Sequence, residues 1–335
     1  MANFEELEAF MPQEANHKNW VLDYLKITEI KQQFGLFRKS SKIKVAVIDT
    51  GINKIDYFND TQVSTYSVVT DYATEFWKKH RNKRRSEIIN QLLKQLKQTD
   101  CPFTDDYDGY TFDELSHGTA ISSYISGQKG ISCNSELIMI KASNDANKPM
   151  NLPLAIYMAV ALGAHVVNIS LEDRCSAELH DAVLQAYFNE VMLVCSAGNS
   201  LEQDVGSIEY PAAFQRTLAI GGYDQDFKLQ NDGARGRLLD FMCPSVSVPS
   251  LTEDDIIAEG TSIASGICSG IIALYMEAHL EIYGRLPTCK DLKKSLISRC
   301  VHPYDPGDYN EEWGYGIIHP WSLFGFLASE SNIAI

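Results

Sequence analysis

Five short runs rich in Val, Ile and Leu recur along the chain without the polar alternation of a half-exposed strand. They are Lys44–Asp49, Leu137–Ala142, His165–Leu171, Val191–Ala197 and Thr217–Gly222. Such runs are typical of strands that are buried on both faces of a parallel sheet. A sheet of this kind needs helices on its two faces, so the sequence between the runs must supply them.

Helical patterns do lie between and around these runs. They cover Trp20–Phe34, Ala120–Ile125, Leu154–Leu162, Ala177–Phe188 and Ile263–Ile282. The alternation predicts an α/β fold: a single domain with a doubly wound, mostly parallel sheet and helices on both faces. In such sheets ligands bind beyond the carboxyl ends of the strands, so we expect a site among the residues that follow each strand.

One segment, from Val69 to Leu115, interrupts the alternation. It contains the basic cluster Lys78–Arg85, an amphipathic stretch at Ile88–Leu96 and acidic residues beyond it. We predict a surface insertion at about 69–115 in a domain that spans 41–335, with an N-terminal extension and first helix at 1–40. The basic cluster is open to three interpretations: a solvated helix face, a nuclear-targeting signal or a site of self-cleavage.

Charge and composition narrow the class of protein. The net charge of −15 argues against nucleic acid as the main partner. We expect no membrane span, and the acidic start Met1–Glu8 lacks the regions of a secretory signal, so we predict a cytoplasmic, intracellular protein. The 8 cysteines form no Cys-x-x-Cys pair, which favours reduced thiols over a disulfide framework.

Four polar segments fall where the predicted sheet should carry a site. They are Val45–Gly51, Ser116–Thr119, Cys195–Asn199 and Gly260–Ser262. Taken singly, Asp49 could cap a turn, His117 could be a surface histidine and Asn199 could be a left-handed loop residue. Ser262, at the start of an apolar helix, could likewise be an ordinary cap.

Taken together, the four segments supply the parts of an acyl-transfer site. A serine hydroxyl is a poor nucleophile at neutral pH, so Ser262 needs a base such as His117. The imidazole in turn needs a carboxylate, Asp49, to fix its tautomer, and Asn199 can donate to the oxyanion. We therefore predict catalytic roles for these four residues, with no metal and no other cofactor.

These motifs resemble those of the subtilisin-like serine proteases, the subtilase family. The order Asp, His, Ser along the chain is the order in subtilisin. Further matches to the family lie at Val167–Leu171, Tyr210–Ala212, Leu239–Pro244 and Trp313–Ile317. The resemblance covers about Lys42 to Ser322 and implies a serine endopeptidase that cuts peptide or protein substrates through an acyl-enzyme.

The resemblance also implies how a substrate is held. It would bind as an extended strand between two edges, formed by Ala142, Ser143 and Asn144 on one side and Ser170, Leu171 and Glu172 on the other. Glu209 falls at the base of the primary specificity pocket, where the family commonly has a small residue. A carboxylate without a partner should await a cation, so we predict a preference for Arg or Lys before the scissile bond. The alternative is that Glu209 turns to solvent.

Two departures from the family pattern carry further expectations. No long prosegment precedes the first strand, so the chain resembles intracellular members of the family. The helix after His117 leads directly to Ser126–Ile131, where many members have a longer calcium-binding loop. We therefore predict activity that survives removal of calcium.

Three other functions compete with proteolysis. The first is a subtilase fold kept as a catalytically inactive binding module, although none of the four catalytic residues is missing. The second is acyl transfer to an amine, as in a transpeptidase or macrocyclase, which passes through the same intermediate. The third, a metal hydrolase, lacks a close pair of His at ligand spacing. If the pocket accepts basic residues, the cluster Lys78–Arg85 becomes a site of self-processing.

Overall fold

The centre of the molecule is a sheet of seven parallel strands, in the order β2-β3-β1-β4-β5-β6-β7. The computed structural model of the chain describes residues 4–12, 20–36, 43–104, 113–144, 150–199, 207–252, 256–303 and 309–331. The strands are β1 (Lys44–Asp49), β2 (Val63–Ser67), β3 (Glu136–Lys141), β4 (Val166–Ile169), β5 (Met192–Ser196), β6 (Thr217–Tyr223) and β7 (Phe241–Pro244).

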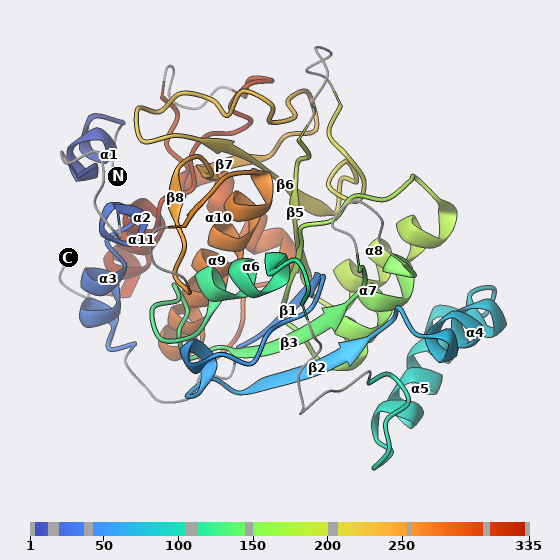
Figure 1. Cartoon of the computed structure of the whole chain (residues 1–335). Coiled ribbons are helices and arrows are strands. Elements are labelled where there is room, and N and C mark those ends of the chain that lie inside the picture. The colour runs from blue at the N-terminus through green and yellow to red at the C-terminus, as the bar shows by residue number, and fades with distance from the viewer. Residues whose placement is uncertain are drawn as a thin grey trace.

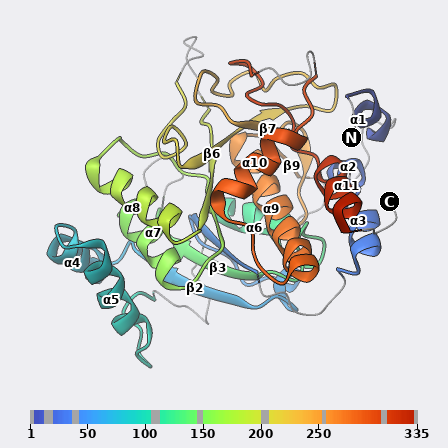
Figure 2. The ribbon, with the colours of Figure 1, turned by 180° about the vertical axis from the view of Figure 1, so that it is seen from behind.

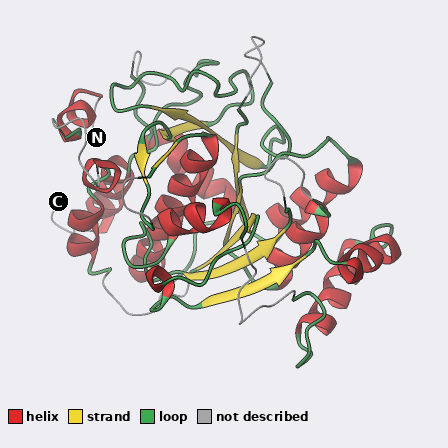
Figure 3. Ribbon diagram, viewed as in Figure 1, coloured by secondary structure: helices red, strands yellow, loops and turns green. Residues whose placement is uncertain are grey.

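Helices cover both faces of this sheet, which confirms the predicted doubly wound α/β fold (Figures 1 and 3). On one face α6 (His117–Ile125) packs against α9 (Thr261–Tyr283), and on the other α7 (Leu152–Ala161) packs against α8 (Ala177–Phe188). The remaining elements are α1 (Phe4–Phe10), α2 (Trp20–Tyr24), α3 (Ile27–Phe34), η1 (Asp56–Phe58), α4 (Asp71–His80), α5 (Arg85–Leu96), β8 (Val248–Pro249), β9 (Ile257–Ala258), α10 (Cys289–Arg299) and α11 (Pro320–Ser331).

Three of the differences between the structure and the sequence-based prediction have a clear local cause. The single helix expected over Trp20–Phe34 is two helices, because Lys26 adopts a left-handed conformation, with φ 56°, between α2 and α3. The strand β2 was not predicted, since its residues are only partly buried and read as a polar run. The strand β7 has four residues and ends in a proline, so it carries little strand signal of its own.

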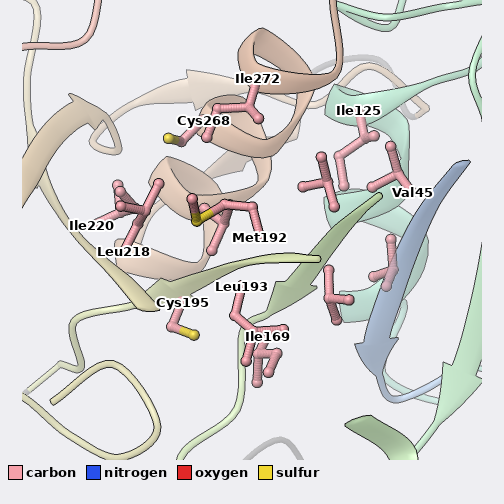
Figure 4. Close-up of a cluster of buried hydrophobic side chains, with 14 of the residues drawn as sticks. Val45, Ile125, Ile169, Met192, Leu193, Cys195, Leu218, Ile220, Cys268 and Ile272 are labelled. Carbon is pink, nitrogen blue, oxygen red and sulfur yellow. The ribbon is translucent and has the colours of Figure 1, made fainter. Parts of the chain in front are cut away.

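The long helix α9 forms the middle of the core. Every residue from Thr261 to Ala278 is buried, and Cys268 and Ile272 lie in the apolar layer with Met192 and Ile220 (Figure 4). Contrary to the prediction that no run is long enough, α9 has the length and apolarity of a membrane span, but 89% of its apolar window is buried. Its position inside the domain accounts for its composition.

Two glycines allow α6 and α9 to approach each other closely. A Cβ on Gly266 would lie 3.1 Å from Cγ2 of Ile121, and one on Gly270 would lie 3.1 Å from the carbonyl oxygen of Tyr124. The first turns of these two helices carry His117 and Ser262, so the glycines help to fix the separation of those residues.

The predicted insertion contains the helical hairpin α4–α5, which lies at the edge of the molecule beyond α7 (Figure 1). Nε of Arg85 donates to Oδ1 of Asp181 at 2.8 Å, and the hydroxyl of Tyr157 donates to Oδ2 of the same carboxylate at 2.8 Å. These contacts tie the start of α5 to α7 and α8. The domain boundaries themselves remain a prediction.

Candidate active site

The candidate site lies where the chain reverses direction across the sheet. The strand β1 has β3 on one side and β4 on the other, so the connections on its two sides lead in opposite directions. A crevice forms at the carboxyl end of a strand in this position. Asp49 is the last residue of β1 and is fully buried.

The structure brings Asp49 and His117 together, 68 residues apart in sequence. Nδ1 of His117, the first residue of α6, lies 2.7 Å from Oδ1 of Asp49. The backbone N–H of Thr50 donates to the same oxygen at 2.8 Å. A carboxylate at Nδ1 leaves Nε2 as the basic nitrogen of the neutral ring, which is the tautomer that a general base requires.

A second carboxylate, Asp113, is hydrogen-bonded to residues next to Asp49 and His117. Its side chain is 1% exposed and accepts hydrogen bonds from Oγ1 of Thr50 at 2.8 Å and from N and Oγ1 of Thr119 at 2.8 and 2.7 Å. The N–H of Gly118 donates to Oγ1 of Thr50 at 3.1 Å. Asp113 therefore links the end of β1 to the start of α6.

The two carboxylates control the protonation of His117. Burial by itself would lower the pKa of the imidazole. The charge of Asp49, its hydrogen bond and the charge of Asp113 all act in the opposite direction, and they hold the pKa of His117 above its ordinary value. A site with this balance stabilises an imidazolium ion once the ring has accepted a proton.

The side chain of Asn199, three residues after β5, is held in one orientation. Its Oδ1 accepts from N and Oγ1 of Thr261 at 3.1 and 3.2 Å and from Nε2 of Gln230 at 2.8 Å. These donors oblige Nδ2 to point elsewhere. A Cβ on Gly260, which has φ 133°, would lie 3.5 Å from Nδ2, so the amide donor faces the turn before Ser262.

Ser262 is the second residue of α9 and shares a cavity of about 550 Å³ with His117 and Asn199. It is 9% exposed and lines this cavity. The helix start offers unpaired N–H groups and a positive dipole end. Ser262, His117 and Asn199 thus line one cavity beside a helix start that would stabilise negative charge.

Acidic residues adjoin one end of the cavity. Glu172 lines it together with Ser170 and Gly198. Glu209 is half-buried, and its Cγ would lie 2.6 Å from a Cβ on Gly198. Burial raises the pKa of Glu172, and the charge of Glu209 raises it further. The structure therefore places Glu172 on the cavity wall and Glu209 beside it.

The predicted binding edge at Ala142, Ser143 and Asn144 is not where the structure places a free strand. Ala142 and Ser143 are fully buried. The N–H of Ala142 donates to the carbonyl of Asp49 at 2.8 Å, and its carbonyl accepts from Met150 at 2.6 Å, so neither group can pair with a substrate. Asn144 is exposed, and residues 145–149 that follow it lie outside the described part of the chain.

The other predicted edge is only partly at the cavity. Ser170 and Glu172 line the cavity, whereas Leu171 between them is buried. The hydroxyl of Ser170 lies 3.0 Å from that of Ser265 and 3.4 Å from the carbonyl oxygen of Ser262, so it is part of the packing around α9.

Residues of the hairpin β8–β9 and its flanks form another part of the cavity wall. Ile256, Ala258 and Glu259 line the cavity from this side, and Leu115 lines it from the loop before His117. Leu115 and Ile256 are 49% and 48% exposed. Large apolar side chains this exposed at the rim of a cavity favour a ligand with apolar groups.

Three supporting residues were not predicted from the sequence: Asp113, Gln230 and Thr261. Asp113 stands four residues before His117, and this proximity was its only signal. Gln230 lies in a loop without a recognisable pattern, and its contact with Asn199 exists only in the folded chain. Within the described residues, no group of three or more His, Cys, Asp or Glu side chains could hold a metal ion.

Comparison with known proteins places the chain in a family. The model of the subtilase family matches residues 40–316. The chain is 27% identical over 295 residues to the major intracellular serine protease of Bacillus subtilis (strain 168), covering 83% of this chain and 82% of that protein. An alkaline protease of Alkalihalobacillus alcalophilus is 31% identical over 175 residues, which are 49% of this chain and 45% of that protein.

The chain spans less than half the length of several of the first curated relatives that it matches, as the coverage of the alkaline protease shows. The minor extracellular protease Epr of Bacillus subtilis (strain 168) is another example, with 24% identity over 90% of this chain and 41% of that protein. Among solved structures, the prenylagaramide maturation protease PagA superimposes with a TM-score of 0.66 at 20% identity, covering 90% of this chain and 98% of that one. The protease domain of PatA gives 0.65 at 20% identity, covering 88% and 98%.

Proposed function

Because the chain belongs to the subtilase family, we propose that it is a serine endopeptidase that hydrolyses peptide bonds through an acyl-enzyme. The observation that carries this proposal is the contact between Nδ1 of His117 and Asp49 at 2.7 Å, in a cavity that also contains Ser262 and Asn199. An inactive binding module would have no use for this arrangement.

In the proposed mechanism, Oγ of Ser262 attacks the carbonyl carbon of the scissile bond and its proton passes to Nε2 of His117. The carbonyl oxygen becomes an oxyanion that accepts from Nδ2 of Asn199 and from the N–H of Ser262. The imidazolium, stabilised by Asp49 and Asp113, then gives its proton to the leaving amine. Water attacks the resulting ester with His117 as base, and this step releases the acid and restores Ser262.

We propose further that the enzyme prefers Arg or Lys immediately before the scissile bond. Burial and the charge of Glu209 raise the pKa of Glu172 on the cavity wall, and a cationic side chain bound there would favour the ionised form of Glu172. Glu172 lines the cavity, whereas Glu209 lies behind the lining residues. Replacement of Glu172 should therefore have the larger effect on selectivity.

Two measurements test the endopeptidase proposal. A fluorophosphonate probe should label the protein at Ser262 and leave the Ser262→Ala variant unlabelled. Incubation with a peptide library, followed by mass spectrometry, should show products cut after Arg and Lys. Labelling of Ser262 without any cleaved peptide would reject peptide hydrolysis while leaving the nucleophile in place, and absence of labelling would support a binding module.

Acyl transfer to an amine is the second candidate function. The exposed apolar side chains of Leu115 and Ile256 favour it, since they could hold an amine-bearing peptide beside the nucleophile and exclude water. The same library experiment separates the two outcomes, because acyl transfer joins the acyl part of one peptide to the amine of another and releases the original leaving amine without consuming water, whereas hydrolysis adds water.

Self-processing at the basic cluster Lys78–Arg85 remains part of the proposal. Lys78 lies within α4 and Arg85 is held by Asp181, so the turn at residues 81–84 is the segment that a second molecule could cut most readily. Purified protein should then contain fragments divided near this turn, and the Ser262→Ala variant should remain whole.

We also propose an intracellular location, because the chain is similar to the major intracellular serine protease of Bacillus subtilis (strain 168).

A further inference from the structure

A second pocket, of about 250 Å³, lies at the opposite edge of the sheet from Ser262. It opens between the helix α10, whose ribbon is visible in Figure 2, and the starts of β5 and β6. Met192 and Thr217 line it, and they are the first residues of those two strands. The catalytic residues follow the other ends of the strands, so the length of β5, about 17 Å, separates the two sites.

The lining of this pocket combines apolar and cationic side chains. Met192, Ile297 of α10 and the ring of Tyr187 form its apolar part. Among the residues that the structure describes, Arg216, Lys290, Lys293 and Lys294 are its cationic lining, and none of the lining residues carries a carboxylate. This local excess of cationic side chains contrasts with the net charge of −15 of the whole chain.

Three of the four cations have no carboxylate partner among the residues that the structure describes: Arg216, Lys290 and Lys294. Lys293 is bound to Asp240 at 2.7 Å. The carboxylate of Glu190, which lies near the start of α10, accepts from the N–H of Cys289. The pocket therefore keeps an excess of positive charge.

One of the free cations is already oriented. The guanidinium carbon of Arg216 lies 4.5 Å from the ring centroid of Tyr187, and Nη1 of Arg216 donates to the hydroxyl of Tyr187 at 3.3 Å. Stacking on a ring restricts the side chain while leaving other N–H donors free for a carboxylate. A ligand carboxylate at this point would meet a donor with little rotational freedom left to lose.

We propose that this pocket binds a segment of the substrate in which acidic side chains flank a large apolar one. Leu or Phe would occupy the apolar part, and Asp or Glu would pair with Arg216, Lys290 and Lys294. The proposal rests on the proposed peptidase function and extends it. Since the cleft carries acidic residues and this pocket carries basic ones, the two sites select different parts of one substrate, and binding at one raises the effective concentration at the other.

The binding test uses full-length Ser262→Ala protein, which cannot consume the probe. The probe is a fluorescein-labelled peptide, Glu-Glu-Leu-Phe-Asp-Glu, followed by fluorescence anisotropy. We expect saturable binding that the double variant Lys290→Glu/Lys294→Glu weakens by about tenfold or more. The matched control, Lys94→Glu/Lys97→Glu, makes the same change in net charge at exposed positions of α5 and its cap and should stay within about twofold of the parent. Arg216→Gln provides a second, milder variant.

Two results would overturn the proposal. One is absence of saturable binding, or equal loss in the pocket and control variants. The other is equal affinity for an oligothymidylate of the same charge, which would reveal a general attraction for polyanions. With active protein, a substrate that joins the acidic segment to an Arg-containing cleavage sequence through a flexible linker should lose kcat/KM in Lys290→Glu/Lys294→Glu, while the short cleavage sequence alone should not. Binding without cleavage would count against the peptidase function and not against the pocket.

Discussion

The proposed oxyanion donor, Asn199, is hydrogen-bonded to a buried residue outside the four motifs, Gln230. It is 1% exposed, and its Nε2 donates to Oδ1 of Asn199 at 2.8 Å and to Oδ1 of Asp232 at 2.7 Å. Its own Oε1 is buried and has no hydrogen-bond partner among the described residues. We predict that Gln230→Leu lowers kcat without raising KM, because it frees the amide of Asn199 to rotate.

The size of this effect follows from the contacts. Complete loss of the oxyanion amide costs about 2.7–4 kcal/mol, a value measured on subtilisin, and this sets the upper limit. Gln230 supplies one of three hydrogen bonds to the amide oxygen, and one neutral hydrogen bond contributes about 1 kcal/mol, so kcat should fall about fivefold. Stability should change little, since the substitution removes a donor from Asp232 but also removes the unpaired Oε1.

The assay is a double-mutant cycle on steady-state kinetics with one peptide substrate. Gln230→Leu should reduce kcat in the parent and cause no further loss in Asn199→Ala, where no amide remains to be oriented. Thermal unfolding of all four proteins checks that the fold is retained. A loss of kcat that is equally large in both backgrounds would show that Gln230 acts elsewhere, and our account of its role would be wrong.

Three further predictions concern protons, selectivity and metal. Because the pKa of His117 is raised above its ordinary value, the acid limb of kcat/KM should have its midpoint above about pH 6.5, and Asp113→Asn, which removes a negative charge, should move that midpoint to lower pH. Because burial and Glu209 raise the pKa of Glu172, that carboxyl takes up a proton before an ordinary glutamate does as the pH falls. The ratio of cleavage after Arg to cleavage after Leu should therefore decline on acidification, and Glu172→Gln should give a low ratio that no longer depends on pH; an unchanged ratio would remove Glu172 from the pocket. Treatment with a calcium chelator should leave the hydrolysis rate unaltered, and a loss that calcium alone restores would contradict the prediction made from the short segment after α6.

The sequence predicted those parts of the fold that depend on local pattern. The predicted bounds of β1 and α8 match the observed ones. A buried strand leaves a continuous apolar run in the sequence, and an amphipathic helix leaves a helical spacing of apolar residues. The break between α2 and α3 at Lys26 left no such signal in the sequence, since a single left-handed residue between two helices is compatible with helical spacing on both sides. The strand β2 was missed for a related reason: at the edge of a sheet, partial exposure removes the apolar run on which the prediction relied.

Within the site, chemistry was a better guide than position. A base, a carboxylate and a hydroxyl are each required by acyl transfer, so Asp49, His117 and Ser262 could be grouped before any distance was known. The binding edge predicted at Ala142, Ser143 and Asn144 depends on the path of the backbone, which a sequence pattern does not give, and both backbone groups of Ala142 are hydrogen-bonded inside the protein. The role of Gln230 could not be predicted from the sequence, because no residue near it along the chain indicates its contact with Asn199.

The separation of His117 from Ser262 is set by the packing of two helices more than by any contact between the residues themselves. Each stands at the start of its helix, so a small displacement of α6 along or away from α9 moves one against the other by the same amount. Gly266 lies one turn after Ser262 and meets Ile121, which lies one turn after His117. A side chain at Gly266 would push the helices apart next to the reacting groups, where a shift of about 1 Å can reduce the rate about a hundredfold. The close approach of α6 and α9 is therefore part of the proposed catalytic geometry, although neither Ile121 nor Gly266 lines the cavity.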